Sequence, residues 1–430
     1  MRLRPLVRSR LAGGVVVFRV DATRKAHSHP IEVAVRYTLS CMPSHMPHHQ
    51  PSLPADVIST AVMPWLSPAV RSWLPSDNPT APVTEWLSEE VWRIDNAEFA
   101  GQLDAAIPVT VSDPMLWANR VLDGRAQHAD QLWTAGSEGT PWILAASRAR
   151  DRDIDRSYVD IIATDLPPSL TTFAVLADPE SGPLHFFKEF SPRCVRVFVA
   201  DPESTATAIN DSGLGLRADI DTLLLAGPVD TTGSKEAHHP TNLTTSLTTS
   251  ERAQLQLVPA HAAEAAEGIS AMYDAIKREV PSLRWWARPS DEPELEECEE
   301  AGLLFALQVT EDSPQPELPS ASCLEGTVGF IAARPNNAFG LTGWEMVEKC
   351  IHPSHQGNNY SAVATALLTQ CLRSFDIPTA PGDSSGRATP VLWGEIDPAN
   401  RPSLGTANKV GRTIVGGHLW LTPAGFPGMN

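Results

Sequence analysis

A polar turn in the last third of the chain has the residue types of an anion site. Residues 355–361 read His-Gln-Gly-Asn-Asn-Tyr-Ser, follow two short apolar strands and lead directly into an amphipathic helix expected at residues 362–373. The first N–H groups of a helix lack partners within it, and the aligned peptide dipoles add about half a positive charge there. The turn therefore predicts a site for a phosphate or pyrophosphate.

Two carboxylates precede this turn on an expected strand at residues 344–351, and they could act as a base. An attacking amine must lose a proton, which a carboxylate can accept. Strand alternation predicts that Glu345 and Glu348 point to opposite faces, so at most one enters a given cleft. We favour Glu345, because it lies an even number of residues from Ile351 and would therefore face the same side of the strand as Ile351, which is the last residue of that strand. An exposed strand carboxylate without a catalytic role is the open alternative.

The elements expected after residue 250 alternate between strands and helices. Ser290 is the expected N-cap of the second helix, and Pro335-Asn-Asn is the expected turn after the third strand. The order predicts an α/β fold, a mixed sheet flanked by helices. The strands are expected at residues 255–258, 303–309, 326–333, 344–351, 391–396 and 413–422, and the helices at about 261–280, 292–300, 362–373 and 401–410.

Four motifs in this region carry a family resemblance. They are the strand Gly326-Thr-Val-Gly-Phe, the strand ending Cys350-Ile-His-Pro353, the turn Gln356-Gly-Asn-Asn-Tyr-Ser and the helix Asn400…Ser403…Gly411-Arg412. In this order they look like the GNAT superfamily of acyl-CoA N-acetyltransferases, over about residues 250–425. The resemblance implies a GNAT-like fold that transfers an acetyl or other short acyl group from acyl-CoA.

The resemblance also implies roles for single residues. In the family, the backbone amides of the turn hold the pyrophosphate of acetyl-CoA, a free strand edge meets the developing oxyanion, and an asparagine contacts the cofactor arm. Helix capping is an equally open role for that asparagine. By position, the implied turn residues are Gln356, Gly357, Asn358, Asn359, Tyr360 and Ser361, the edge residues are Cys350 and Ile351, and the asparagine is Asn400.

The match to the family pattern is incomplete at two places. Asn359 and Ser361 stand where glycines are usual in the turn. The last helix has Ala407 and Asn408 where many relatives have the tyrosine that protonates the leaving thiolate. The sequence therefore leaves the general acid unidentified, while Glu345 lies near the catalytic glutamate of histone-type members.

The chain before residue 251 divides into three predicted segments. Residues 1–50 contain eight Arg and Lys residues and two acidic ones, which fits a disordered tail, a misassigned start or, as a third interpretation, a targeting sequence. Residues 55–226 are expected to form an α/β domain. Residues 227–250 are rich in Gly, Pro, Ser and Thr and are expected to be a linker. A GNAT-like domain at 251–430 follows it.

The predicted first domain could be a degenerate copy of the second. Its apolar and Trp-rich start, which includes Trp86, Val91, Trp92, Ile107, Leu116, Trp117, Val121, Leu132 and Trp133, suggests packed helices. Strands are expected at residues 141–146, 158–163, 173–177, 195–199 and 223–225, with a helix at 203–210. Its strand, helix, strand ending repeats that of the second domain. It has no glycine turn like the one at Gln356, so we expect it to bind no cofactor.

Composition excludes several classes of protein. The chain has 430 residues, 42% of them hydrophobic, and a formal net charge of -18, which disfavours nucleic-acid and anionic-membrane surfaces. It has no apolar run of about 18 residues that would span a bilayer. Its six cysteines form no CxxC pair, so we expect no zinc site, no disulfide framework and a reducing cytoplasm. His352 and His355 are expected to be loop residues rather than metal ligands.

The sequence therefore predicts an acyl-CoA-dependent N-acetyltransferase. The acceptor would be a primary amine of a small molecule or peptide that attacks directly in a ternary complex. The negative charge favours a cationic acceptor. The alternative is a lapsed GNAT-fold protein that binds acyl-CoA or a protein partner without transfer. The acceptor's identity, the acyl group and the oligomeric state are not predicted.

Overall fold

The computed structural model describes nine stretches of the chain, and every structural statement below concerns these residues. They are residues 60–86, 132–134, 142–150, 154–180, 182–229, 255–280, 288–309, 326–375 and 388–429. They belong to one compact unit. The basic segment 1–50 and most of the predicted linker lie outside the described residues.

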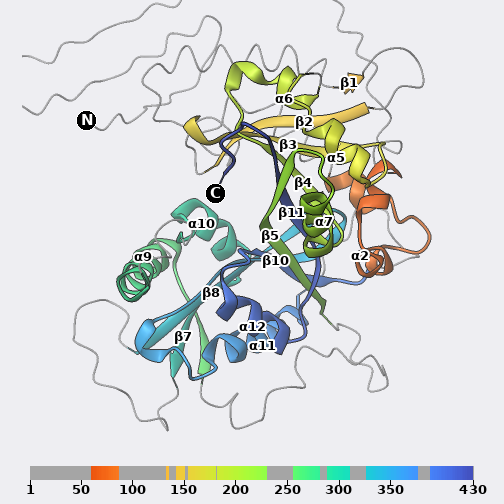
Figure 1. Cartoon of the computed structure of the whole chain (residues 1–430). Coiled ribbons are helices and arrows are strands. Elements are labelled where there is room, and N and C mark those ends of the chain that lie inside the picture. Colours follow the sequence, from red (N-terminus) through yellow and green to blue (C-terminus); the bar gives the residue numbers. More distant parts are fainter. Residues whose placement is uncertain are drawn as a thin grey trace, which may run out of the picture. The chain divides into compact units, whose positions relative to one another are not determined.

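One mixed sheet runs through the described residues (Figure 1). It has 11 strands in the order β1-β2-β3-β4-β11-β5-β10-β9-β8-β7-β6. Two neighbouring pairs are parallel, β3 with β4 and β9 with β10. The predicted α/β class with a mixed sheet is therefore confirmed. The strands are β1 (Leu132–Thr134), β2 (Trp142–Ala149), β3 (Ser157–Thr164), β4 (Val195–Val199), β5 (Leu216–Pro228), β6 (Leu255–Pro259), β7 (Leu304–Val309), β8 (Thr327–Ala338), β9 (Leu341–Ile351), β10 (Val391–Ile396) and β11 (Thr413–Pro423).

The two halves of the sheet exchange their last strands. β5 ends the first half in sequence but lies between β10 and β11, and β11 ends the second half but lies between β4 and β5. Outward from this centre, β4, β3 and β2 match β10, β9 and β8 in order and in parallel or antiparallel pairing. The connectivity of the two halves thus repeats, while the interpretation of the first half as a degenerate copy stays a prediction. The sheet is continuous across the predicted domain boundary, and the two-domain division stays a prediction.

Helices cover both faces of the second half of the sheet. α9 and α10 pack on one face against Phe330 and Cys350. α11 packs on the other face against Ile331 and Ile351. α7 and α12 pack on that second face as well. Ile220 of β5 contacts both the hydrophobic cluster that includes residues of α7 and the one that includes residues of α12. The helices are α2 (Pro68–Trp73), α5 (Leu170–Leu176), α6 (Pro183–Phe186), α7 (Pro202–Asp211), α9 (Ala262–Glu279), α10 (Glu292–Glu300), α11 (Tyr360–Leu372) and α12 (Arg401–Lys409), with 3-10 turns η1 (Met63–Trp65), η4 (Ile154–Arg156), η5 (Lys188–Phe190) and η7 (Pro353–His355).

Two predicted boundaries in the second half are wrong. The N-cap of α10 is Asp291 rather than Ser290, because Asp291 and Glu294 form a reciprocal capping box. The turn expected at Pro335 lies instead at Phe339 and Gly340, whose φ angles are +54° and +83°. Both central residues of such a tight hairpin need positive φ. Phe339 is held there by ring stacking on Phe198, with the centroids 4.0 Å apart.

Two predicted elements in the first half have the wrong type. A strand was expected at residues 173–177, but most of this segment belongs to helix α5. The side chain of Ser169 caps that helix by accepting from Thr172 N, and Phe173 and Leu176 face the core together. Leu132 and Trp133 lie in strand β1 rather than in a helix. Trp86 is buried, as expected of a core residue. The other predicted helical residues, from Val91 to Val121, lie outside the described residues.

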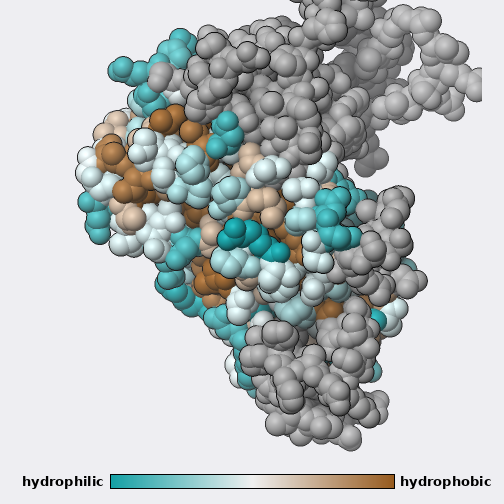
Figure 2. Space-filling model, turned by 90° about the vertical axis from the view of Figure 1, so that its right-hand side faces the viewer, coloured by the Kyte–Doolittle hydropathy of each residue, from teal (hydrophilic) through white to brown (hydrophobic). Residues whose placement is uncertain are grey.

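The surface shown in Figure 2 is mixed. Hydrophobic side chains form small patches separated by hydrophilic ones on that face. Within the described part of the chain, no helix is both long enough and apolar enough to span a bilayer.

Candidate functional site

Strands β9 and β10 pair over only three residues and then separate. The register joins Gly343 with Val391, Trp344 with Leu392, and Glu345 with Trp393. β9 continues to Ile351, while β10 keeps pairing with β5 as far as Ile396. We call the place beyond the last pair the β9/β10 divergence. Backbone groups on this inner edge of β9 are not used by β10, which is the arrangement the sequence predicted for a free strand edge.

A bulge in β9 brings the two predicted carboxylates to the same face of the sheet. Ala332 pairs with Glu348 and Ala333 with Met346, so Val347 is an extra residue. An extra residue inverts the alternation of side chains beyond it. Glu345 and Glu348 therefore both face α9 and α10, and Ile351 faces α11. The prediction that the carboxylates lie on opposite faces, with Glu345 on the face of Ile351, is wrong for this reason.

Glu348 is buried, and both of its carboxylate oxygens accept hydrogen bonds. Its Oε1 accepts from the Tyr273 hydroxyl at 3.1 Å and from Lys349 N at 2.8 Å, and its Oε2 accepts from Ser290 N at 3.1 Å. Only 4% of the residue is exposed. Burial raises the pKa of Glu348 above its usual value, although these hydrogen bonds act in the opposite direction. A buried carboxylate with a raised pKa is suited to accept a proton.

Glu345 is committed to an ion pair. Its Oε2 accepts from Arg334 Nε at 2.8 Å and from Asn336 Nδ2 at 2.7 Å. Arg334 also binds Glu297 of α10, so the pair ties β8 and β9 to that helix. The catalytic role of Glu345 stays a prediction, but its environment is that of a structural carboxylate, whereas that of Glu348 is suited to proton transfer.

The two predicted edge residues differ in where their N–H groups point. His352 N donates to Val328 O of β8 at 2.9 Å. In an antiparallel ladder, this orientation recurs every second residue, so the N–H of Cys350 also faces β8 and that of Ile351 faces the divergence. The Cys350 side chain is buried against Met272 of α9. Of the two, Ile351 therefore has the backbone N–H that could meet an oxyanion.

The polar turn leads into α11 as predicted, and several of its backbone N–H groups have no partner among the described residues. Gly357 has φ +85°, and no described atom lies within 4 Å of the place where a Cβ would be. Asn359, the N-cap of α11, has φ +63°. The N–H groups of Gly357, Tyr360 and Ser361 donate to no other described residue. Open space in front of free N–H groups at a helix start fits a pyrophosphate.

The side chains of the turn mostly bind the turn itself. Gln356 Nε2 donates to Ile351 O at 3.2 Å, and Asn358 Nδ2 donates to His355 O at 3.2 Å. His355 is buried, and its ring lies 6.3 Å from that of Tyr360. Burial lowers the pKa of His355, which keeps it neutral near pH 7. Gln356 and Asn358 therefore hold the loop in shape, and their predicted contact with a cofactor stays a prediction.

Asn400 caps α12. Its Oδ1 accepts from Ser403 N at 3.2 Å, which confirms the capping role. A contact with the cofactor arm stays a prediction. In the described residues, no group of three His, Cys, Asp or Glu side chains is arranged to hold a metal ion.

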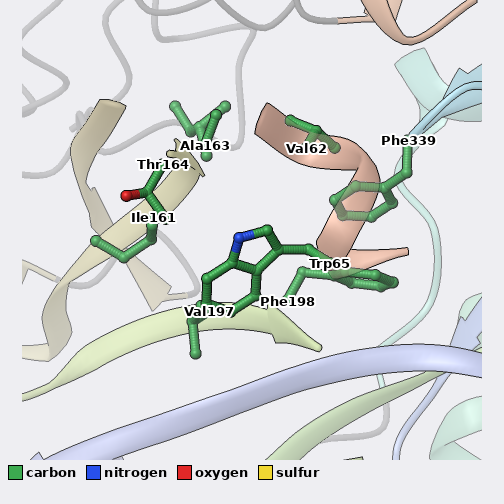
Figure 3. Close-up of a pocket in the computed structure, with 9 residues that line it drawn as sticks. Val62, Trp65, Ile161, Ala163, Thr164, Val197, Phe198 and Phe339 are labelled. Atoms are coloured by element: carbon green, nitrogen blue, oxygen red, sulfur yellow. The ribbon is translucent and has the colours of Figure 1, made fainter. Parts of the chain in front are cut away.

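Protein side chains line a small pocket at the equivalent divergence in the first half (Figure 3). β3 and β4 pair from Val159 to Ile161 and then separate. Trp65 of η1 is one of the lining residues, and its Nε1 donates to Leu166 O at 3.1 Å. Where α11 starts with a glycine turn, α5 starts after Pro167-Pro-Ser169. The expectation that this half binds no cofactor stays a prediction.

Sequence reasoning missed three residues at the site. Tyr273 lies in the helix expected at about residues 261–280 but has no predicted site role, and Ser290 was expected only as a helix cap, yet both bind Glu348. Arg412 was recognised only as part of a motif, and it is buried beside the divergence. A tyrosine on a stripe of Ala, Ile and Met was the one available signal, because a buried hydroxyl needs a partner.

The chain was compared with protein families, curated proteins and solved structures, and only solved structures match. No family model matches the chain, and no curated protein matches it. Among solved structures, a GNAT-family acetyltransferase from Colwellia psychrerythraea matches with 10% identity and a TM-score of 0.35, over 71% of this chain and 96% of that one.

Two further structures match in the same way. A GCN5-related N-acetyltransferase from Sphaerobacter thermophilus has 10% identity and a TM-score of 0.37, over 75% of this chain and 90% of its own. A tandem GNAT protein from the clavulanic acid biosynthesis pathway has 11% identity and a TM-score of 0.35, over 79% and 96%. All three of these structures are described as GNAT or GCN5-related proteins, and each is at most 11% identical to this chain.

Proposed function

We propose that this protein transfers an acetyl or other short acyl group from acyl-CoA to a primary amine of a small molecule or peptide. The observation that carries the proposal is the β9/β10 divergence. It is bordered by a buried carboxylate, Glu348, and β9 leads directly into a helix start with unpartnered N–H groups. A base and an anion site are the two features that amine acylation by a phosphorylated thioester carrier requires.

The residues divide the chemistry between them. Acyl-CoA supplies a thioester whose carbonyl carbon is the electrophile. The backbone of Gly357, Tyr360 and Ser361 would bind its pyrophosphate, and the Ile351 N–H would stabilise the oxyanion. Glu348 would accept the amine proton as the new C–N bond forms and the C–S bond breaks. Tyr273 and Ser290 hold the Glu348 carboxylate in place.

The test combines binding with turnover. Calorimetric titration with acetyl-CoA should show binding, and a panel of amines (spermidine, an aminoglycoside and a lysine-containing peptide) should release thiol. Glu348→Gln should lower kcat/KM about 100- to 1,000-fold, in the range of general base catalysis, with acetyl-CoA affinity unchanged.

Glu345→Gln is the matched control, because it changes a carboxylate on the same face of the same strand. It should weaken the tie to Arg334 and lower stability by about 1–2 kcal/mol, with less than a tenfold change in kcat/KM. Full turnover by Glu348→Gln would refute the assignment of the base. Failure of the wild type to bind acetyl-CoA would refute the function and favour a role in binding a protein partner.

A further inference from the structure

Arg412 is a buried cation without a carboxylate partner among the described residues. Only 1% of it is exposed. Its Nη2 donates to Leu225 O at 2.9 Å and more weakly to Gly394 O at 3.4 Å, and its buried Nε has no partner. Burial lowers its pKa to about 10, so it stays charged at pH 7. Because an unpaired buried charge costs several kcal/mol, packing alone does not explain an arginine here.

The Arg412 guanidinium lies at the point where β9 and β10 begin to diverge. Beyond the last pair of the two strands, Gly394 is the next residue of β10 and Met346 the next residue of β9. Arg412 contacts both, since its Nη1 lies 3.8 Å from Met346 Sδ. A Cβ on Gly394 would lie 3.0 Å from Nη2. The two strands therefore separate around this charge.

The charge acts on groups along β9. Lys349, beyond the bulge, lies on the α11 face with Arg412, and burial together with the Arg412 charge lowers the Lys349 pKa to about 7. The other charged groups nearby offset little of the Arg412 charge. Glu348 faces α9, Glu395 of β10 binds Arg196, and Lys409 at the end of α12 is exposed. α11 contains no charged residue.

We propose that Arg412 stabilises the CoA thiolate that leaves when the thioester is cleaved. The inference rests on the proposed function. The electron pair of the C–S bond leaves with the sulfur, and the amine proton goes to Glu348, so the sulfur needs a positive field rather than a proton donor. This accounts for a last helix that carries Ala407 and Asn408 and no tyrosine. Arg412 acts through its field and is a positioning residue, because it is enclosed by protein.

The test measures the ionisation of bound CoA without any turnover. CoA and desulfo-CoA are titrated calorimetrically between pH 7.5 and 9.5, in buffers with different ionisation enthalpies. With a free thiol pKa of roughly 8.5 and a lowering of one unit, CoA should release about 0.4 proton at pH 7.5 and desulfo-CoA none. By the same arithmetic, the preference for CoA over desulfo-CoA should rise from about twofold at pH 7.5 to about ninefold at pH 9.5.

Variants assign the effect to Arg412. Arg412→Met should abolish both the proton release and the pH-dependent preference, and Arg412→Lys should retain much of each. Lys349→Met is the matched control and should keep both, because Lys349 is largely neutral above pH 7. Loss of the effect in Lys349→Met with retention in Arg412→Met would overturn the inference.

If Arg412→Met fails to fold, titration of the wild-type protein with CoA and desulfo-CoA still tests the inference. Equal binding of CoA and desulfo-CoA by the wild type at every pH would overturn the role of Arg412 and leave the proposed function standing. Binding of neither compound would overturn both.

Discussion

Gly343 determines how closely β9 and β10 approach before they diverge, and its replacement gives the sharpest test of this geometry. It pairs with Val391 and has φ +146°, which L-residues rarely adopt. A Cβ at this position would overlap Val391 O and lie 2.7 Å from Val391 N. Both obstacles are backbone atoms, so no side chain can turn away to make room.

The cost of Gly343→Ala follows from these two features. An unfavourable φ costs about 1–3 kcal/mol, and forcing extra volume into a packed site costs about 1–3 kcal/mol more. We therefore expect a loss of about 4 kcal/mol, a large share of the roughly 5–15 kcal/mol that stabilises a typical protein. The strands can relieve the overlap only by separating at the first of their three pairs, so acetyl-CoA affinity should fall as well.

Urea denaturation followed by circular dichroism measures the loss. The control is Gly405→Ala in α12, where no atom lies within 4 Å of the added Cβ and the helix gains from alanine. That variant should gain about 0.5–1 kcal/mol. A loss below about 1 kcal/mol in Gly343→Ala, with an unchanged denaturant slope, would refute the close approach of β9 and β10 described above.

Two more predictions concern the turn and the amine at the divergence. Gly357→Glu should cost about 1–2 kcal/mol of stability because of the positive φ and should weaken acetyl-CoA binding at least about 100-fold, through a negative charge at the helix start, when measured by calorimetry. Gly357→Asn, which tolerates positive φ, is its control, and equal affinity in the Glu variant would remove the pyrophosphate from this turn. Burial lowers the pKa of Lys349 to about 7 in the folded protein, from its ordinary value of 10.5. Between these values the folded protein binds fewer protons than the unfolded one, so its stability should rise with pH across that window. Lys349→Met should remove this rise and be more stable than the wild type below pH 7 in thermal unfolding scans, and parallel pH curves for the two proteins would contradict the burial of the amine.

Local signals predicted most elements of the second half. β10 spans residues 391–396 as expected, and α9, α10 and α12 begin and end within about one residue of their predicted ranges. Apolar periodicity and the helix-ending residues, such as the proline that follows residue 280 and Gly411, were sufficient, because each acts within one turn or strand. The turn before α11 was also predictable, since a helix start is a local feature.

Non-local features of the site were not predictable from the sequence. One extra residue, Val347, reverses which face of the sheet the following side chains of β9 point to. No residue type in the sequence predicts a bulge of this kind. The engagement of Glu345 by Arg334 depends on cross-strand register, which the displaced hairpin turn at Phe339 sets. The preference for Glu345 over Glu348 rested on an alternation that the bulge breaks.

The strand exchange makes the first half of the sheet part of the surroundings of the β9/β10 divergence. Arg412 of the second half donates to Leu225 of β5, so the first half supplies part of the wall around the charge at the β9/β10 divergence. The matching divergence between β3 and β4 is lined by Trp65, which donates to Leu166 O. One half thus places a tryptophan at its own divergence and provides a strand to the other. Under the proposed function, a first half without a cofactor site would leave the site of the second half intact, provided β5 stayed in the sheet.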